Sequence, residues 1–189
     1  MKNNTNEKTE EHTEFINGKV KIGEIDSVAH NSAVLEIASA LKNYIAENGS
    51  KCKVFTENVA LYCDELCNNK GNLFLPDVMC VRDKNGIRDD GVHTAPEFVV
   101  EVTSDATKKN DYCRKMVVYE EIGVREYWVV DLQRNLIVRY LADNDFVPEF
   151  VVYDECQDKC ISVSTYPGLR IELSRIFAYH LSEDTLAGV

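Results

Sequence analysis

Long apolar segments are missing from this chain of 189 residues. No apolar run approaches the roughly 20 residues that are needed to span a bilayer. The N-terminal residues, MKNNTNEKTEEHTEF, also lack the apolar stretch of a signal peptide. We therefore expect a soluble, cytoplasmic protein with no membrane partner.

A disulfide framework is lacking as well. The seven cysteines are an odd number and lie scattered along the chain, which favours reduced thiols. Two pairs share a C-x3-C spacing, Cys63 with Cys67 and Cys156 with Cys160. These four thiols would form a zinc site only if the fold brought both pairs together. The alternative is four unrelated thiols, and it is favoured because structural zinc pairs more often use tighter spacings.

Basic residues are scarce, with 21 Lys and Arg against 32 Asp and Glu, and the formal net charge is -11. A protein that binds nucleic acid usually presents a basic surface to the phosphates, so this charge argues against tight, unspecific DNA binding. Part of the acidic excess is local, in an N-terminal tail and a late loop: Glu7, Glu10, Glu11, Glu14, Glu155 and Asp158. Clustered carboxylates are also what a metal site needs.

The polar residues 1–13 show no periodicity and are predicted to be a disordered tail. Residues 14–189 form a single predicted domain, since 44% hydrophobic residues suffice for one core. An extended segment is expected around residues 15–25, with a turn at Asn17-Gly18.

Helical periodicity is clearest in the first third of the chain. A first helix is expected to be capped by Asn31 or Ser32 and to end at Gly49. Its apolar face repeats at three and four residues: Val34, Ile37, Ala38, Leu41, Tyr44 and Ile45. A second helix is predicted from about 106 to 122, and a short last one from a Ser174 cap through His180.

The remaining apolar segments read as strands, and Asn85-Gly86 and Asp90-Gly91 mark a loop over 82–94. We predict strands at about 51–62, 73–81, 97–103, 125–132 and 136–141, and shorter ones at 150–153 and 161–163. The strand–helix–strand order over 97–132 favours a parallel crossover, with 136–141 as a hairpin partner. The fold class is α/β, a mixed β-sheet flanked by helices with extra C-terminal β segments.

Two carboxylates stand out against this background. Glu101 lies inside the apolar strand EFVVEVT, where a buried carboxylate is costly unless it is paired or bound to metal. Asp77 follows Pro76 within a β segment. The alternatives are an open strand end that solvates Glu101 and an ordinary Pro-Asp turn. Carboxylates at the ends of neighbouring strands would suit a hard cation such as Mg²⁺.

Lys115 is a candidate third member of this site. Asp111, Lys115 and Tyr119 are spaced by four and so form one stripe of the second helix. This helix directly follows the Glu101 strand, so an inward-facing Lys115 would reach the carboxylates. The alternative, favoured slightly by spacing alone, is an Asp111–Lys115 pair on the surface.

Together these segments resemble a known protein family. The segments P-D-V, A-P-E-F-V-V-E-V-T-S, D-x-x-x-K-x-x-x-Y and G-V-R-E-Y-W-V-V-D are similar to those of the Uma-type restriction endonucleases, in the PD-(D/E)XK nuclease superfamily. The match covers roughly residues 28 to 142. It implies a restriction-endonuclease-like fold and a metal-dependent endonuclease that hydrolyses phosphodiester bonds of DNA.

The resemblance also implies roles for single residues. Asp77 and Glu101 match metal ligands, for Mg²⁺ or Mn²⁺, and the backbone carbonyl of Val102 matches a further ligand. The usual lysine position, two residues after the acid, holds Thr103, and Lys115 on the following helix is the match. Asp111 and Tyr119 match supporting positions.

Four other residues are further candidates for the site or the core. His30, before the first helix, would contact phosphate, although a capping or surface histidine is the commoner case. Glu36 would face the site from the first helix, as acidic residues sometimes do in this superfamily. Tyr127 and Trp128 are expected in the core and at the sheet edge.

Three functions therefore compete. The first is a DNA endonuclease, expected to act as a homodimer because a two-fold axis would pair two sites on a duplex. The second is a noncatalytic descendant of the nuclease fold that serves as a binding or assembly module, which the acidic charge favours. The third is a zinc-stabilised interaction protein that uses the two C-x3-C pairs.

Overall fold

The structure, a computed structural model, describes residues 13–22, 26–67, 71–103, 109–154, 156 and 159–179. The predicted tail therefore lies outside the described residues, except for Thr13, which begins the first strand. No helix in the described part is both long and apolar enough to cross a membrane.

A mixed six-stranded sheet lies at the centre of the molecule, in the order β12-β11-β10-β9-β6-β3. The strands are β3 (Lys53–Thr56), β6 (Val78–Val81), β9 (Phe98–Thr103), β10 (Glu126–Asp131), β11 (Leu136–Leu141) and β12 (Glu149–Val152). The neighbours β9 and β10 are parallel, and β11 pairs antiparallel with β10. Both the predicted crossover and the predicted hairpin partner are thus confirmed.

A second six-stranded sheet of short strands has the order β2-β1-β5-β4-β8-β7. It consists of β1 (Thr13–Ile16), β2 (Lys19–Ile22), β4 (Leu61–Tyr62), β5 (Leu73–Phe74), β7 (Ile87–Arg88) and β8 (Gly91–Val92). A small third sheet pairs β13 (Cys160–Ser162) with β14 (Arg170–Glu172).

The second sheet corrects three expectations. The predicted strand 51–62 is two strands in different sheets, and Asn58 between them has a φ of 60°, which a continuous strand does not allow. The predicted strand 73–81 is divided likewise, near Pro76, which has no N–H to donate to a ladder. The predicted loop 82–94 contains the β7–β8 hairpin.

The helices also begin elsewhere than expected. Helix α1 (Val28–Glu47) is capped by Ser27, whose hydroxyl accepts the N–H of His30 at 3.1 Å, so Asn31 and Ser32 are not its caps. His30 therefore lies in the first turn of α1 and not before it. Helix α3 (Leu173–Ile176) contains Ser174 and begins after Glu172, and the predicted end at His180 lies outside the described residues.

The second predicted helix is α2 (Met116–Ile122), preceded by a π-helical segment, Asn110–Lys115. As predicted, Gly123 ends it, with a φ of 88° that favours glycine. Residues 104–108, where the helix was expected to begin, lie outside the described part.

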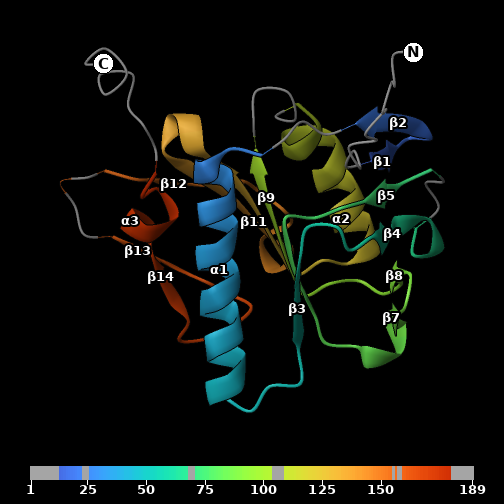
Figure 1. Cartoon of the computed structure of the whole chain (residues 1–189), viewed down its shortest axis with the longest axis horizontal. Coiled ribbons are helices and arrows are strands. Elements are labelled where there is room, and N and C mark those ends of the chain that lie inside the picture. The colour runs from blue at the N-terminus through green and yellow to red at the C-terminus, as the bar shows by residue number, and fades with distance from the viewer. Residues whose placement is uncertain are drawn as a thin grey trace, which may run out of the picture.

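The two faces of the central sheet carry different cores. Successive strand residues alternate between the faces, so Trp128 packs with α1 and the C-terminal strands, whereas Tyr127 packs with α2 and the second sheet. Both aromatic residues belong to the core, as expected. Figure 1 shows α1 and α2 on opposite sides of β9. Glu101 shares the face of Val99 in β9 and so points toward α2.

Candidate active site

The site begins where β9 ends and β6 starts. These strands are antiparallel with Val78 opposite Val100, which places Asp77, just before β6, beside the end of β9. The Asp77 carboxylate accepts the backbone N–H of Val102 at 2.6 Å. Glu101, next to Val102, is 3% exposed. An open strand end is therefore not what accommodates Glu101.

Lys115 points inward and not to the surface. Its Nζ lies 3.0 Å from Glu101 Oε2 and 3.6 Å from Asp111 Oδ1, and its side chain is 4% exposed. The ammonium also lies 5.6 Å from the centre of the Phe74 ring, where a cation–π contact is favourable. The surface pair that spacing alone favoured is replaced by a buried one.

Tyr119 completes the stripe of the helix. Its hydroxyl donates to Glu101 Oε1 at 2.6 Å, so both oxygens of Glu101 have partners from this helix. Burial and the charge of Glu101 hold the pKa of Tyr119 well above its usual range, which keeps the hydroxyl protonated as a donor. The π-helical segment before α2 contains both Asp111 and Lys115, and such wide turns are frequent at functional sites.

Glu14 is a site residue that the sequence reasoning missed. It was assigned to the acidic N-terminal tail, but it lies in β1 and its Oε1 is 2.9 Å from Lys115 Nζ. The same oxygen accepts the N–H of Leu75 at 2.9 Å. The hairpin pattern on either side of Asn17-Gly18 is the signal that would have taken Glu14 out of the tail.

The β1–β2 hairpin that carries Glu14 is held close to the rest of the second sheet. The Gly18 N–H donates to the Gly71 carbonyl at 2.7 Å. Gly71 has a φ of 93°, and a Cβ there would lie 2.4 Å from Gly18 N, so only glycine fits this approach.

Negative charge is in excess around Lys115. Burial and the charges of Asp77, Asp111 and Glu14 raise the pKa of Glu101 despite the opposing effect of Lys115. Burial lowers the pKa of Lys115, but its carboxylate neighbours outweigh burial and hold that pKa well above the usual range. The lysine is therefore charged, and one ammonium does not balance the carboxylates around it. Such a cluster suits a divalent cation.

The donor set fits a hard cation. Asp77 and Glu101 supply carboxylate oxygens, each of which keeps a lone pair beyond its present hydrogen bond. Mg²⁺ typically takes one or two carboxylates and completes its shell with waters and substrate phosphate.

The structure places the two remaining candidates on α1, His30 and Glu36, in different surroundings. His30 Nε2 lies 3.3 Å from Asp77 Oδ2, so His30 joins the site. Burial lowers the pKa of His30, but the hydrogen bond and charge of Asp77, with help from Asp26 and Glu57, raise it overall. Glu36 instead lies within electrostatic reach of Arg175 in α3, where its charge adds to the raised pKa of that guanidinium.

The two cysteine pairs do not meet. Among the described residues, which include all four thiols, no group of three or more ligating side chains contains a cysteine. Cys63 is buried in the core beside α2, and burial raises the pKa of its thiol, whereas zinc binds the thiolate. The zinc-stabilised interaction protein is therefore not supported by the fold.

Comparison with known proteins agrees with this architecture. A crystal structure described as a putative nuclease belonging to DUF820, from Anabaena variabilis, matches with a TM-score of 0.70 over 89% of this chain and 91% of that chain. The identity is 16%, so the likeness shows a shared fold, and it confirms the predicted fold class. No curated protein matches the chain.

The sequence itself matches a family model over residues 3–174, most of the chain. The model is described as "Uma2: Putative restriction endonuclease", which confirms the resemblance seen in the motifs around Asp77, Glu101 and Lys115. The chain belongs to the Uma2 family of putative restriction endonucleases.

Proposed function

We propose that this protein is a Mg²⁺-dependent endonuclease that hydrolyses phosphodiester bonds of DNA at the cluster of Asp77, Glu101 and Lys115. The observation that carries the proposal is the burial of Lys115 among Glu101, Asp111 and Glu14. Burying several charges is costly, and a purely structural core gains little from it. Metal-dependent phosphodiester hydrolysis can use such a combination, because carboxylates hold the cation and a cationic side chain stabilises charge on the phosphate.

Each residue has a distinct part in this proposal. Asp77 and Glu101 hold the cation, with the Val102 carbonyl as a third ligand. A bound Mg²⁺ supplies a Lewis acid that polarises the phosphodiester and lowers the pKa of a water. Lys115 orients the attacking water and stabilises charge on the phosphate. Tyr119 and His30 position Glu101 and Asp77 through their hydrogen bonds, and Asp111 and Glu14 position Lys115.

A noncatalytic binding or assembly module is the second candidate. The formal net charge of -11 favours it, because DNA binding usually needs basic surface. Three carboxylates also surround the ammonium of Lys115. In an active enzyme this ammonium would have to reach the phosphate instead. A cation at Asp77 and Glu101 would draw Glu101 away from Lys115 and so release it.

Cleavage of supercoiled plasmid separates these two candidates. We expect nicking with Mg²⁺ or Mn²⁺ and none with a chelator. The Asp77→Asn variant, purified identically, is the control for contaminating nucleases and should not cleave. Asp90→Asn, a matched change at an exposed aspartate, should cleave like the wild type. Absence of cleavage on every DNA form, with intact metal binding, would favour the assembly module.

We further propose that two copies pair through β12, the last strand of the central sheet. Phe150 and Val152 on this strand are 65% and 56% exposed, whereas Val151 between them packs on the core. Antiparallel pairing of β12 with a second copy would cover these side chains and extend the sheet across a two-fold axis. Sedimentation at micromolar protein should show a dimer, and Phe150→Glu should give a monomer. A wild type that sediments only as a monomer contradicts this pairing.

A further inference from the structure

A second group of potential ligands lies next to the site, at the start of α1. Asp26 precedes the helix cap, His30 lies in the first turn, and Glu57 follows β3. The Glu57 N–H donates to the Asp77 carbonyl at 3.3 Å, which ties this residue to the start of β6. Within the described part of the chain, these residues are the only group of three or more His, Cys, Asp or Glu side chains whose ligand atoms all lie within 4.8 Å of one another.

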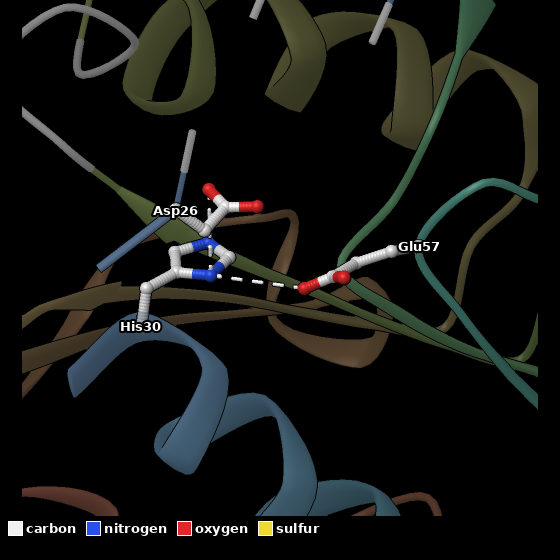
Figure 2. Close-up of side chains that lie close together, drawn as sticks. All are labelled: Asp26, His30 and Glu57. Carbon is white, nitrogen blue, oxygen red and sulfur yellow. Dashed lines mark ion pairs between the residues drawn. The ribbon is translucent and has the colours of Figure 1, made fainter. Parts of the chain in front are cut away.

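Both carboxylates of this group face the same ring nitrogen. His30 Nδ1 lies 3.6 Å from Asp26 Oδ1 and 3.7 Å from Glu57 Oε1, and both dashed lines of Figure 2 start from it. These distances are too long for hydrogen bonds, and the buried Nδ1 makes none. They are close to the separation of two ligands that share an ion, about 3.0–3.5 Å for bonds of about 2.0–2.2 Å.

The other ring nitrogen has the partner that a metal-binding histidine usually has. His30 Nε2 lies 3.3 Å from Asp77 Oδ2. A ligating histidine commonly donates its second N–H to a carboxylate, which sets the tautomer and leaves the first nitrogen with its lone pair. A cation on Nδ1 would displace the proton that the raised pKa of His30 favours there, and Nε2 would keep its N–H toward Asp77.

His93 is a second buried histidine between two carboxylates, and its geometry differs from that of His30. Its Nδ1 lies 3.0 Å from Glu65 and its Nε2 lies 3.0 Å from Asp90, so the carboxylates are on opposite sides of the ring. The ring also stacks on Tyr62 at 4.2 Å. His93 Nδ1 also makes no hydrogen bond, but each ring nitrogen of His93 lies beside one carboxylate only, so the two carboxylates do not converge on one nitrogen as they do at His30.

We propose that Asp26, His30 and Glu57 bind a first-row transition cation such as Zn²⁺ or Mn²⁺, at a site separate from the Mg²⁺ site of Asp77 and Glu101. An imidazole nitrogen with two carboxylates suits these ions better than Mg²⁺, which prefers an all-oxygen shell. The Asp26 side chain is 38% exposed, which gives the ion a path from solvent. Three protein ligands leave a further position for water.

This site would act on the nuclease centre through His30. A cation on Nδ1 makes Nε2–H a stronger donor, and the acceptor of that donor is Asp77. Occupancy would therefore fix the orientation of Asp77. Binding at this site does not depend on the proposed nuclease activity.

The test measures binding of Zn²⁺ and Mn²⁺ to the full chain, by equilibrium dialysis with metal analysis and by Mn²⁺ electron paramagnetic resonance. Glu101→Gln serves as the background because it removes a ligand of the neighbouring site and leaves Asp26, His30, Glu57 and Asp77 in place. The Glu101→Gln variant should still bind one Zn²⁺ or Mn²⁺ tightly.

Adding His30→Gln or Glu57→Gln to the background should weaken binding by more than about a hundredfold, since changing even an outer partner of a metal ligand costs about 10–100-fold. Adding His93→Gln, the matched control, should leave binding unchanged. Thermal unfolding without metal verifies that each variant is folded.

The inference is overturned if Glu101→Gln alone abolishes binding of both ions, or if His30→Gln binds them as the background does. A wild type that binds neither ion also overturns it. A protein that binds Zn²⁺ at His30 but never cleaves DNA would refute the proposed function and leave this site standing.

Discussion

Replacing Glu101 by glutamine is expected to lower Mg²⁺-dependent DNA cleavage by about a thousandfold or more. Loss of a ligand removes several kcal/mol of charge stabilisation from the transition state, and about 4 kcal/mol corresponds to about a thousandfold in rate. Glutamine keeps the size of the side chain and one oxygen, which can still accept from Tyr119. The change therefore removes the charge with little change in shape. The measurement is the single-turnover nicking rate at saturating Mg²⁺.

Glu126 offers a matched control for this substitution. It is also a buried glutamate in the central sheet, where it accepts from Trp128 Nε1 at 2.8 Å and from the Thr165 N–H at 2.7 Å. It lies opposite Phe98, at the start of β9 and so at the other end from Glu101. Glu126→Gln should cleave at the wild-type rate per folded molecule. Equal losses in both variants would mean that the loss reports stability and not chemistry.

Replacing Lys115 by methionine is expected to destabilise the fold by about 3–5 kcal/mol, the usual cost of removing one partner from a buried ion pair. Methionine fills most of the volume but leaves Glu14, Glu101 and Asp111 facing one another without the ammonium. Denaturant unfolding without metal measures the loss. The exposed Lys42 on α1 is the control, and Lys42→Met should change stability by less than about 0.5 kcal/mol.

Two additions to Lys115→Met test the electrostatic origin of this loss. Glu14→Gln in the same chain should restore part of the stability, because it removes one of the carboxylates left without a cation. Mg²⁺ should stabilise Lys115→Met more than the wild type, since a bound cation supplies the missing positive charge. Stability equal to the wild type in Lys115→Met would show that the lysine is not a structural part of the cluster.

The sequence by itself predicted the elements whose periodicity is strong. The apolar spacing of α1, the strongly apolar strands β9 and β10 and the glycine at 123 each have a local physical cause, and all three were predicted. Chain order then gave the parallel pair, because a strand, a helix and a strand in sequence favour a crossover. The short strands of the second sheet were not separated in advance, because two-residue strands carry almost no pattern.

The sequence also determined which face of β9 carries the acid. Alternation along the strand puts Glu101 on the face opposite Val100 and Val102, whatever packs there. Packing decides which helix covers that face. It also decides whether the stripe of Asp111, Lys115 and Tyr119 faces the sheet or the solvent. Spacing alone slightly favoured a surface pair for Lys115, and burial against the sheet reversed that preference.

Only the tertiary structure brought in residues that are distant along the chain. Glu14 reaches Lys115 across about a hundred residues, because the β1–β2 hairpin closes on Gly71. Asp26 and Glu57 meet at one nitrogen of His30 because α1 begins beside the end of β3. Each of these acids is ordinary in its local sequence. A charge cluster depends on distances in space, and local periodicity carries no information about distances between segments that only the folded core holds together.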